Sequence, residues 1–459
     1  MRQLPTLLRA ALLSLAGVSL ASAQGSFHTD IYSDSALPGS GTLAVFVEYP
    51  DKYDSRHRAG APVVLYSPGG VTNTGSFGPD QILEGLVELG FVSVRFLLPG
   101  GSFATYSSGG IYDNRSTACT SAMRDALLYA AGRATDTAGL TILDRVAHAN
   151  LNNVGIFASS NGGPLATNTI ALHGKALSLP HWLVGWENPS CAQTIITDAG
   201  RPDLDPDSAT DSDGNGVPGD DGKNLSYYGY SPTTLAIDYS SIIRDGQILL
   251  LDRDGDGQAT FLGPPGNPRY DVDGNGILDI DEDFPIKGFM YDDGGGTRLY
   301  LSRQARAACD DLGVALPGTY ASTEACAEYW RTRENAGSSY FAGRACPQTA
   351  VMLIYSEQDH VQVADDKPHI AQAYMGWQAA GNWARLNPDA AYIGLAYSGT
   401  FGGAVPPGTP DNAANCPLPA NMNGSAFPSN VLAGKNYLTL GGCVEMADRL
   451  EYDKWNNDL

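Results

Sequence analysis

Basic residues are scarce in this 459-residue sequence, in which 28 Lys and Arg stand against 50 Asp and Glu for a formal net charge of −22. A surface with this balance repels phosphate backbones and anionic lipid headgroups, and it attracts cations. We therefore expect no nucleic acid and no anionic membrane surface among the partners of this protein.

Long apolar runs are missing after the first two dozen residues. Residues 1–23 carry Arg2 and Arg9, then an apolar run that ends in small residues, which is the pattern of a secretory signal peptide. We expect the mature chain to begin at Gln24 with a charge of −24, because two arginines and no acidic residue are removed. No later stretch is apolar enough to span a bilayer. The protein is expected to be secreted, periplasmic or attached to the cell envelope, without a transmembrane segment.

An even number of cysteines is also missing, since the sequence has seven: Cys119, Cys191, Cys309, Cys326, Cys346, Cys416 and Cys443. Disulfides persist in exported proteins, so pairing is expected and one thiol is left over. On sequence proximity alone, we expect one bond between Cys416 and Cys443. A second is expected between two of Cys309, Cys326 and Cys346.

A short apolar run ends in a turn of serine and glycine at residues 153–164, Asn-Val-Gly-Ile-Phe-Ala-Ser-Ser-Asn-Gly-Gly-Pro. A nucleophilic serine on a sharp strand-to-helix turn has a strained backbone and needs small residues two positions before and after it. Ser160 meets this need with Ala158 and Gly162, whereas Ser159 would have a phenylalanine at one of these places. The turn resembles the Gly-x-Ser-x-Gly elbow of the α/β-hydrolase superfamily. The alternative is a polar loop in which Ser160 only caps a helix.

Strand and helix patterns alternate around this turn. Strands are predicted at residues 42–49, 61–66, 91–98, 182–186, 349–355 and 383–393, and helices at 81–89 and 117–134. Such alternation predicts an α/β fold with a mostly parallel, doubly wound sheet covered by helices on both faces.

A second glycine turn, Ser67-Pro68-Gly69-Gly70, follows the predicted strand at residues 61–66. In the α/β-hydrolases, a glycine turn at this place and the residue after the nucleophile supply the backbone N–H groups that bind the oxyanion. The resemblance therefore implies Gly70 or Val71, together with Asn161, as donors. The alternative is an ordinary glycine turn after a strand.

The alternation of strands and helices stops between residues 190 and 348. We expect a hydrolase-like domain in two parts, residues 24–189 and 349–459, the second ending in a loop-rich C-terminal segment. The insert between them falls where α/β-hydrolases commonly carry lids. Asp, Gly, Asn and Pro dominate its first two-thirds, and its second part looks helical from about residue 299.

One segment of the insert, residues 271–282, matches the twelve-residue calcium loop of EF-hand and dockerin-type repeats. Its predicted ligands are Asp271, Asp273, Asn275, Asp279, Glu282 and the carbonyl of Ile277. Prolines flank the loop, so helices on both sides are not expected, and structural calcium fits better than a sensor. The alternative is a solvated acidic loop.

Two further segments of the insert repeat the first half of this loop. Their predicted ligands are Asp252, Asp254 and Asp256 in one, and Asp211, Asp213 and Asn215 in the other. Neither segment has an acid at position 12, so another ligand or water must complete each site. The sequence thus predicts Ca²⁺ as a structural cofactor of the lid.

A catalytic base for Ser160 is harder to assign, because no histidine follows His369. In the α/β-hydrolases the acid follows the strand after the lid, and the histidine follows the last strand. Asp359 stands where the acid is expected, with His360 beside it. Either His360 with Glu187 as its acid, or His369 with Asp359, would complete a triad. The third interpretation is an inactive site.

Two functions follow from these patterns. The first is a secreted serine hydrolase that acts on small or polymeric carboxylic esters and is stabilised by calcium. The second is a catalytically inactive protein with the α/β-hydrolase fold that binds calcium and serves a structural role in the envelope or outside the cell.

Overall fold

The computed structural model describes most of the α/β body and short pieces of the insert. The described residues are 24–51, 57–70, 75–189, 242–245, 248–251, 290–292, 297–299, 319–322, 325, 332–333, 335, 338–354, 368–389, 391–393 and 435–455.

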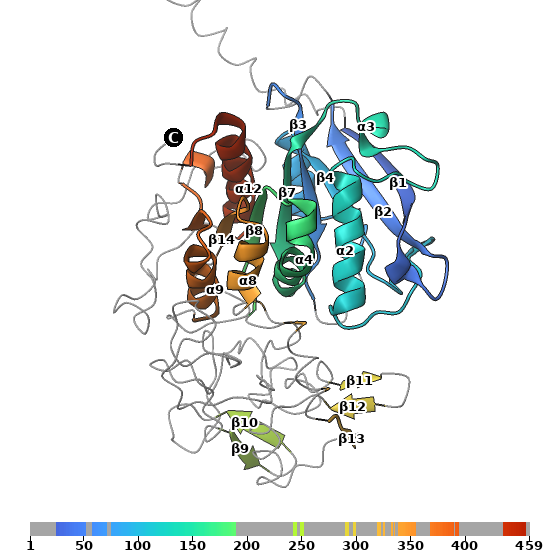
Figure 1. Ribbon diagram of the computed structural model, residues 1–459, viewed down its shortest axis with the longest axis vertical. Helices are drawn as coiled ribbons and strands as arrows, with labels where there is room; N and C mark the ends of the chain where they lie inside the picture. The colour runs from blue at the N-terminus through green and yellow to red at the C-terminus, as the bar shows by residue number, and fades with distance from the viewer. Residues whose placement is uncertain are drawn as a thin grey trace, which may run out of the picture.

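An eight-stranded sheet forms the centre of the molecule, in the order β1-β2-β4-β3-β7-β8-β14-β15 (Figure 1). Its strands are β1 (Gln24–Tyr32), β2 (Thr42–Pro50), β3 (Ala61–Ser67), β4 (Val92–Phe96), β7 (Ala149–Ser159), β8 (Trp182–Trp186), β14 (Ala350–Ile354) and β15 (Ala384–Leu386). β2 pairs antiparallel with β1 and with β4, whereas the other neighbouring strands pair parallel. The mostly parallel sheet predicted from the sequence is confirmed.

The central strands are buried on both faces. Every residue of β4, β8 and β14 is buried, as expected for parallel strands that are covered by helices on both sides. β8 and β14 are continuous apolar runs, and β4 has apolar residues at alternate positions, which explains why the sequence alone located them within two residues at each end.

Helices cover both faces of the sheet (Figure 1). On one face α2 (Thr117–Ala130), α4 (Gly162–Leu177), α8 (Ser338–Ala345) and α9 (Pro368–Ala379) pack in a row, each against the next. On the other face α1 (Gln81–Glu88) packs against α12 (Lys435–Tyr452), which lies on β7, β8 and β14. Strands that precede the insert in the sequence and strands that follow it therefore form one sheet.

Smaller elements complete the described chain. They are η1 (Asp34–Ala36), the hairpin of β5 (Ser102–Phe103) and β6 (Tyr106–Ser107), and α3 (Ile142–Arg145). Within the insert, β9 (Ile242–Asp245) pairs with β10 (Ile248–Leu251), and β12 (Thr297–Leu299) pairs with β11 (Met290–Asp292) and β13 (Thr319–Tyr320). Helix α8 falls inside the predicted insert, but it packs on α4 as part of the α/β body.

Two predictions near the C-terminus differ from the structure. The strand predicted at residues 383–393 is limited to Ala384–Leu386, because Asn387 takes a positive φ of 55° and turns the chain. The segment expected to be loop-rich contains α12, which has 18 residues and is buried against the sheet.

The disulfide predictions are also corrected where the structure describes the cysteines. Cys119, Cys346 and Cys443 are buried and carry free thiols, so the expected bond between Cys416 and Cys443 is wrong. Cys443 lies within α12 and faces the core, and burial raises its thiol pKa. Proximity in sequence does not determine which way a helical side chain points. A bond between Cys309 and Cys326 would involve residues outside the described ranges.

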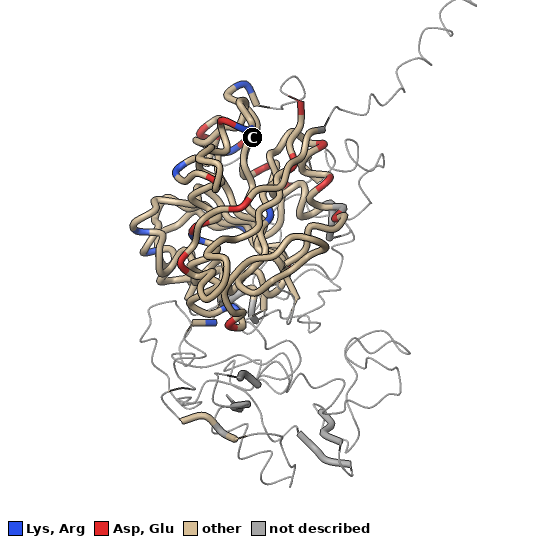
Figure 2. Tube along the Cα trace, turned by 90° about the vertical axis from the view of Figure 1, so that its right-hand side faces the viewer, with Lys and Arg blue, Asp and Glu red and all other residues tan. Residues whose placement is uncertain are grey.

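Charged residues of both signs are interspersed along the described chain in the view of Figure 2. Among the described helices, none combines the length and the apolar character that crossing a membrane requires.

Candidate active site

Ser160 occupies a strained turn between β7 and α4. β7 ends at Ser159, and Ser160 has a φ of +48°, a left-handed conformation that costs a residue other than glycine about 1–3 kcal/mol. The Ser160 N–H donates to the Trp186 carbonyl at 2.8 Å, and the Ser160 carbonyl accepts from the Gly163 N–H at 2.9 Å. The positive φ falls on Ser160 and not on Ser159, in agreement with the spacing of small residues in the sequence.

The strand and the helix pass so closely here that only glycine fits after the turn. A Cβ atom on Gly162 would lie 2.1 Å from the Ser67 carbonyl oxygen, and one on Gly163 would lie 2.1 Å from the Asn188 side chain. The Ser67 hydroxyl donates to the Gly162 carbonyl at 2.8 Å. The end of β3 is thereby joined to the start of α4.

The amide of Asn188 joins β7 to β8 at this edge. Its Nδ2 donates to the carbonyls of Ala158 at 3.0 Å, Ser160 at 2.8 Å and Trp186 at 3.1 Å. By binding three carbonyls, the Asn188 amide holds the turn in its strained form. The sequence gives one sign of the role of Asn188, which is its place two residues after a buried strand, at the carboxyl edge of the sheet.

The glycine turn after β3 lies against Ser160. A Cβ atom on Gly69 would lie 3.2 Å from the Ser160 Cβ and 3.0 Å from the Ser159 carbonyl oxygen. Gly70 has a φ of +79°, and its carbonyl accepts from the Asn161 side-chain amide at 3.3 Å. Gly70 and Asn161 are thus neighbours beside Ser160. Val71 lies outside the described residues.

A buried arginine holds this glycine turn from behind. Arg115 Nη1 donates to the Pro68 carbonyl at 2.6 Å, and Nη2 donates to the carbonyls of Gly69 at 2.6 Å and Gly70 at 2.8 Å. Its side chain is fully buried. No local spacing in the sequence reveals the role of Arg115, because its partners lie more than forty residues earlier in the chain.

Ser160 opens into a cavity of about 490 Å³. The lining residues that the structure describes are Tyr66, Pro68, Gly69, Gly70, Ser76, Gly78, Pro79, Asp80, Leu83, Arg95, Ser159, Ser160 and Trp186. The mixture of aromatic, glycine and polar groups around a serine is suited to a small organic ligand.

The polar groups of the cavity are themselves held in place. Burial raises the pKa of Tyr66, and the charge of Asp80 adds to this, while hydrogen bonds from Ser159 and the Gly69 N–H oppose it. Asp80 caps α1 by accepting from the Ile82 N–H at 2.9 Å and the Leu83 N–H at 3.0 Å. Arg95 forms an ion pair with Glu48 and donates to the Gly78 carbonyl at 2.6 Å.

The predicted partners of Ser160 are described only in part. Glu187 follows β8 with a φ of +44°, is 1% exposed, and donates its N–H to the Ile354 carbonyl at 2.9 Å. His369 is the second residue of α9, the helix between β14 and β15. Asp359 and His360 lie outside the described residues. The carboxyl ends of β8 and β14 lie at the same sheet edge as Ser160, because both strands run parallel to β7.

The histidine side chains that the structure describes do not line the cavity of Ser160. The His28 ring stacks on Tyr106 at 3.8 Å between centroids, and His57 Nε2 pairs with Asp448 at 2.7 Å. His148 Nε2 lies 2.8 Å from the Pro50 carbonyl, and the Val154 N–H donates to the ring of His181 at 3.1 Å. His173 lies on α4.

The predicted calcium ligands lie outside the described residues. They are Asp211, Asp213, Asn215, Asp252, Asp254, Asp256, Asp271, Asp273, Asn275, Ile277, Asp279 and Glu282. In the part of the chain that the structure describes, no group of three His, Cys, Asp or Glu side chains is arranged to hold a metal ion.

No known family model matches this chain, and no curated protein does. The solved structures found to be similar are esterases and α/β-hydrolases. Carboxyl esterase 2 from the fungus Tuber melanosporum is 11% identical, with 80% of this chain and 77% of that chain covered and a TM-score of 0.38. Esterase Est22 is 11% identical over 79% of this chain and 70% of that chain, with a TM-score of 0.38. An α/β-hydrolase from a Medee basin deep-sea metagenome library is 19% identical over 36% of this chain and 59% of its own, with a TM-score of 0.24.

Proposed function

We propose that this protein is a secreted serine hydrolase of the α/β-hydrolase type that cleaves carboxylic esters. One observation carries the proposal: Ser160 is held at a φ of +48° against the Gly69-Gly70 turn, and all three residues line one cavity. A strained serine at the end of a parallel strand, beside a glycine turn, is suited to nucleophilic attack on an acyl carbonyl.

In this proposal the Ser160 hydroxyl attacks the ester carbonyl carbon and loses its proton to a base. The negative charge that develops on the carbonyl oxygen is stabilised by backbone N–H groups. Asn161 and Gly70 are the donors we favour, because Asn161 is the N-cap of α4 and Gly70 lies beside it. The N–H groups at the start of a helix have no partner within the helix, and the helix dipole favours negative charge there.

Two arrangements of base and acid remain in the proposal. His360 with Glu187 is the first, supported by the burial of Glu187 directly after β8, the neighbour of the nucleophile strand. His369 with Asp359 is the second, supported by the place of His369 at the start of the helix that follows β14. The carboxylate orients the histidine in either arrangement, so that the ring can accept the serine proton.

We further propose that structural calcium stabilises the insert and that the protein acts outside the cytoplasm. The first part rests on the acidic loop at residues 271–282, and the second on the signal-like segment at residues 1–23. Secreted proteins meet calcium at concentrations that loops of this kind can bind.

An inactive protein with the same fold is the second candidate. The observation in its favour is that no histidine side chain within the described residues lines the cavity with Ser160. Without a base the serine hydroxyl is a weak nucleophile, and the elbow would then be only a structural feature.

Labelling with a fluorophosphonate probe separates the two candidates, because this probe reacts with activated serines. The wild type is expected to be labelled at one site and to hydrolyse p-nitrophenyl esters, and Ser160→Ala is expected to lose both. Ser159→Ala, which removes the neighbouring hydroxyl, is the matched control and should still be labelled. A wild type that is neither labelled nor active on a broad panel of esters would support the inactive candidate.

The base is identified by a second pair of variants. If His360→Ala abolishes turnover and His369→Ala preserves it, the arrangement with Glu187 is supported. The reverse result supports the arrangement with Asp359. Turnover that survives both substitutions contradicts the proposed triads.

A further inference from the structure

The direction of the glycine turn is set by the groups that hold its carbonyls. In a trans peptide the C=O and N–H point in opposite directions. The carbonyls of Pro68 and Gly69 point to Arg115, so the N–H groups of Gly69 and Gly70, which belong to the same two peptides, point away from it. The Gly69 N–H indeed meets the hydroxyl of Tyr66, a residue that lines the cavity. Arg115 therefore turns the donor side of these peptides toward the cavity.

The charge of Arg115 acts in the same sense as its geometry. Within the described residues Arg115 makes no ion pair, and its hydrogen bonds go to three carbonyl oxygens. A cation that draws electron density from these carbonyls polarises the peptides, and chains of hydrogen bonds strengthen one another in this way. Their N–H groups become better donors, and a positive charge lies behind the place where an oxyanion would form.

Arg115 itself lies in a strained loop. Asn114 and Arg115 have φ values of 54° and 67°, and each left-handed residue costs about 1–3 kcal/mol, so the surrounding structure must hold both. The Asp113 carboxylate supports one side of the loop, because it accepts from the N–H groups of Ser116 at 3.0 Å and Ala118 at 2.6 Å.

The other side of the loop is held by residues near the end of the insert. Arg333 Nε donates to the Asn114 carbonyl at 2.7 Å, and its Nη2 donates to the Asp113 carbonyl. The hydroxyls of Thr332 and Ser116 are 2.7 Å apart. Both Thr332 and Arg333 are buried. The end of the insert is thus joined, through this loop, to the arginine that holds the glycine turn.

We propose that Arg115 is a positioning residue of the oxyanion site and that Arg333 positions Arg115. The proposal rests on the proposed serine hydrolase function. It assigns a task to the end of the insert that differs from covering the site. Arg333 holds the loop of Asn114 and Arg115, and Arg115 orients the glycine turn whose Gly70 N–H is a proposed oxyanion donor.

Arg115→Lys tests the first step, because lysine keeps the charge but cannot reach three carbonyls with one ammonium group. Displaced donors weaken the binding of the transition state more than the binding of the ester in its ground state. We expect kcat for a p-nitrophenyl ester to fall about 10- to 100-fold, while KM changes by less than about threefold. The rate of fluorophosphonate labelling should fall in parallel with kcat. In Arg115→Ala, added guanidinium chloride at non-denaturing concentration should restore part of kcat, and urea should not.

Arg333→Gln tests the second step. It removes the two donors to the Asp113 and Asn114 carbonyls and leaves Arg115 in the chain. We expect the same separation of kcat from KM, with a smaller fall. The matched control is Arg449→Lys, a substitution at another buried arginine away from the cavity, which should lower the melting temperature and leave kcat and KM as in the wild type.

The results are decisive in each case. An unchanged kcat in Arg115→Lys would overturn the inference and leave the proposed function intact. The same conclusion would follow if kcat fell in both Arg115→Lys and Arg449→Lys, in each case only in proportion to the loss of stability. If Arg115→Lys does not fold, Arg333→Gln decides by the same criterion. A wild type that is neither labelled by the fluorophosphonate nor active on esters overturns the proposed function, and this inference with it.

Discussion

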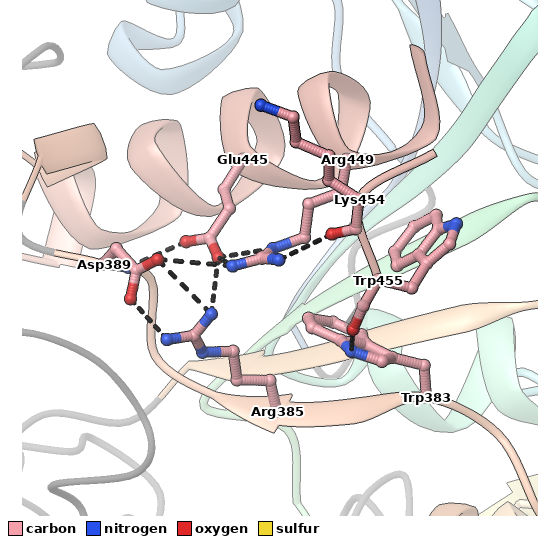
Figure 3. Close-up of polar contacts among 7 residues, drawn as sticks. All are labelled: Trp383, Arg385, Asp389, Glu445, Arg449, Lys454 and Trp455. Atoms are coloured by element: carbon pink, nitrogen blue, oxygen red, sulfur yellow. Dashed lines mark hydrogen bonds and ion pairs between the residues drawn. The ribbon is translucent and has the colours of Figure 1, made fainter. Parts of the chain in front are cut away.

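Two regions of the molecule bury arginine in different ways. Beside Ser160, the partners of Arg115 are carbonyl oxygens, which are neutral. Between β15 and α12, the partners of Arg385 and Arg449 are the carboxylates of Asp389 and Glu445 (Figure 3). Arg449 is 1% exposed and Glu445 is not exposed, with 2.7 Å between their charged atoms.

The difference teaches what each region is suited to do. Carboxylates neutralise the charges of the arginines beside β15, so this ion-pair cluster has a structural role and holds α12 to the edge of the sheet. Two hydrogen bonds to the backbone add to these contacts. Glu445 accepts from the Asp389 N–H at 2.7 Å, and Arg449 donates to the Lys454 carbonyl at 2.8 Å. At Arg115 the charge is left to polarise peptides beside a serine, which is suited to chemistry.

The largest expected effect comes from breaking the structural cluster with Arg449→Met. Loss of one partner leaves Glu445 and Asp389 with an uncompensated buried charge, so we expect a loss of about 3–5 kcal/mol in the free energy of unfolding, with kcat unchanged. Burial already raises the pKa of Glu445. Loss of Arg449 raises it further, and the folded state then binds a proton that the unfolded state releases. The loss should therefore be larger at about pH 8 than at about pH 5, as measured by urea denaturation.

Arg124→Met is the control for this prediction. Arg124 pairs with the neighbouring Asp125 and is 32% exposed, so its ion pair is worth less than about 1 kcal/mol. An equal loss of stability in the two variants would contradict the larger contribution of the buried cluster to the free energy of unfolding.

A smaller effect is expected when the packing at the elbow is broken with Gly162→Ala. The new Cβ meets the backbone carbonyl of Ser67 at 2.1 Å, which cannot move aside without shifting the glycine turn. We expect a loss of about 1–3 kcal/mol in stability and at least a 10-fold loss of kcat. Thermal melting and ester turnover measure the two losses.

Gly442→Ala in α12 sharpens the same comparison. Its Cβ would meet the Met352 sulfur at 3.0 Å and the Ile354 Cδ1 at 3.1 Å, which are the far ends of side chains and can adjust. Alanine also favours a helix over glycine by about 1 kcal/mol, so little change in stability is expected and none in turnover. If Gly442→Ala lowered kcat as much as Gly162→Ala does, the contrast between the two regions would fail.

Asp136 is an intermediate case, because its buried charge has both backbone and arginine partners. Its carboxylate accepts from the N–H groups of Ala138 and Leu140, each at 2.9 Å, and from Arg145 Nη2 at 2.7 Å. Burial would raise the pKa of Asp136, but the hydrogen bonds from Leu140, Arg145 and Thr29 outweigh it and the pKa is lowered.

The sign of the pH dependence follows from this lowered pKa. The stabilisation is present above the pKa of an unfolded aspartate, about 3.9, and is lost as pH falls through the folded pKa. We expect Asp136→Asn to lose about 1–2 kcal/mol at neutral pH and to be closer to the wild type in acid. Urea denaturation across this pH range measures the difference, and a loss that does not vary with pH would show that the charge is unimportant.

The smallest effect is expected from calcium. With a dissociation constant of about 10⁻⁴–10⁻³ M and ~1 mM calcium, each occupied loop adds about 0.4–1.4 kcal/mol to stability. Excess chelator should therefore lower the melting temperature of the wild type. Glu282→Gln, which removes the predicted bidentate ligand at position 12, should reduce this difference. Identical melting with and without chelator would remove calcium from the proposal.

Local pattern was sufficient for the central strands and for the elbow. β3, β8 and β14 are short, mostly apolar runs between turns, and such runs are buried wherever helices cover both faces of a parallel sheet. The position of Ser160 followed from residue sizes within five positions, because the crowding of strand and helix is itself local. These features could be read from the sequence since each depends on neighbours in the chain.

Helix α12 could not be read in this way. Residues 438–449 are all buried, so no polar face gives the 3.6-residue period, and Gly441-Gly442 in the middle disfavours a helix by local propensity. The reason for these glycines is tertiary. A Cβ on Gly441 would lie 3.0 Å from the backbone of Tyr392 and Ile393, so only glycine lets the helix approach so closely.

The sequence by itself determined the mostly parallel sheet, the strained serine and the glycine turn beside it. The tertiary structure alone decided that Arg115 holds the glycine turn, that Asn188 holds the serine turn and that Arg333 holds the loop of Arg115. It also decided that Arg385 and Arg449 connect the C-terminal helix to the sheet edge. The backbone carbonyls that Arg115 and Arg333 bind lie 45 to 220 residues away in the chain. Any residue offers a carbonyl, so no residue type or spacing marks such a contact until folding brings the two segments together.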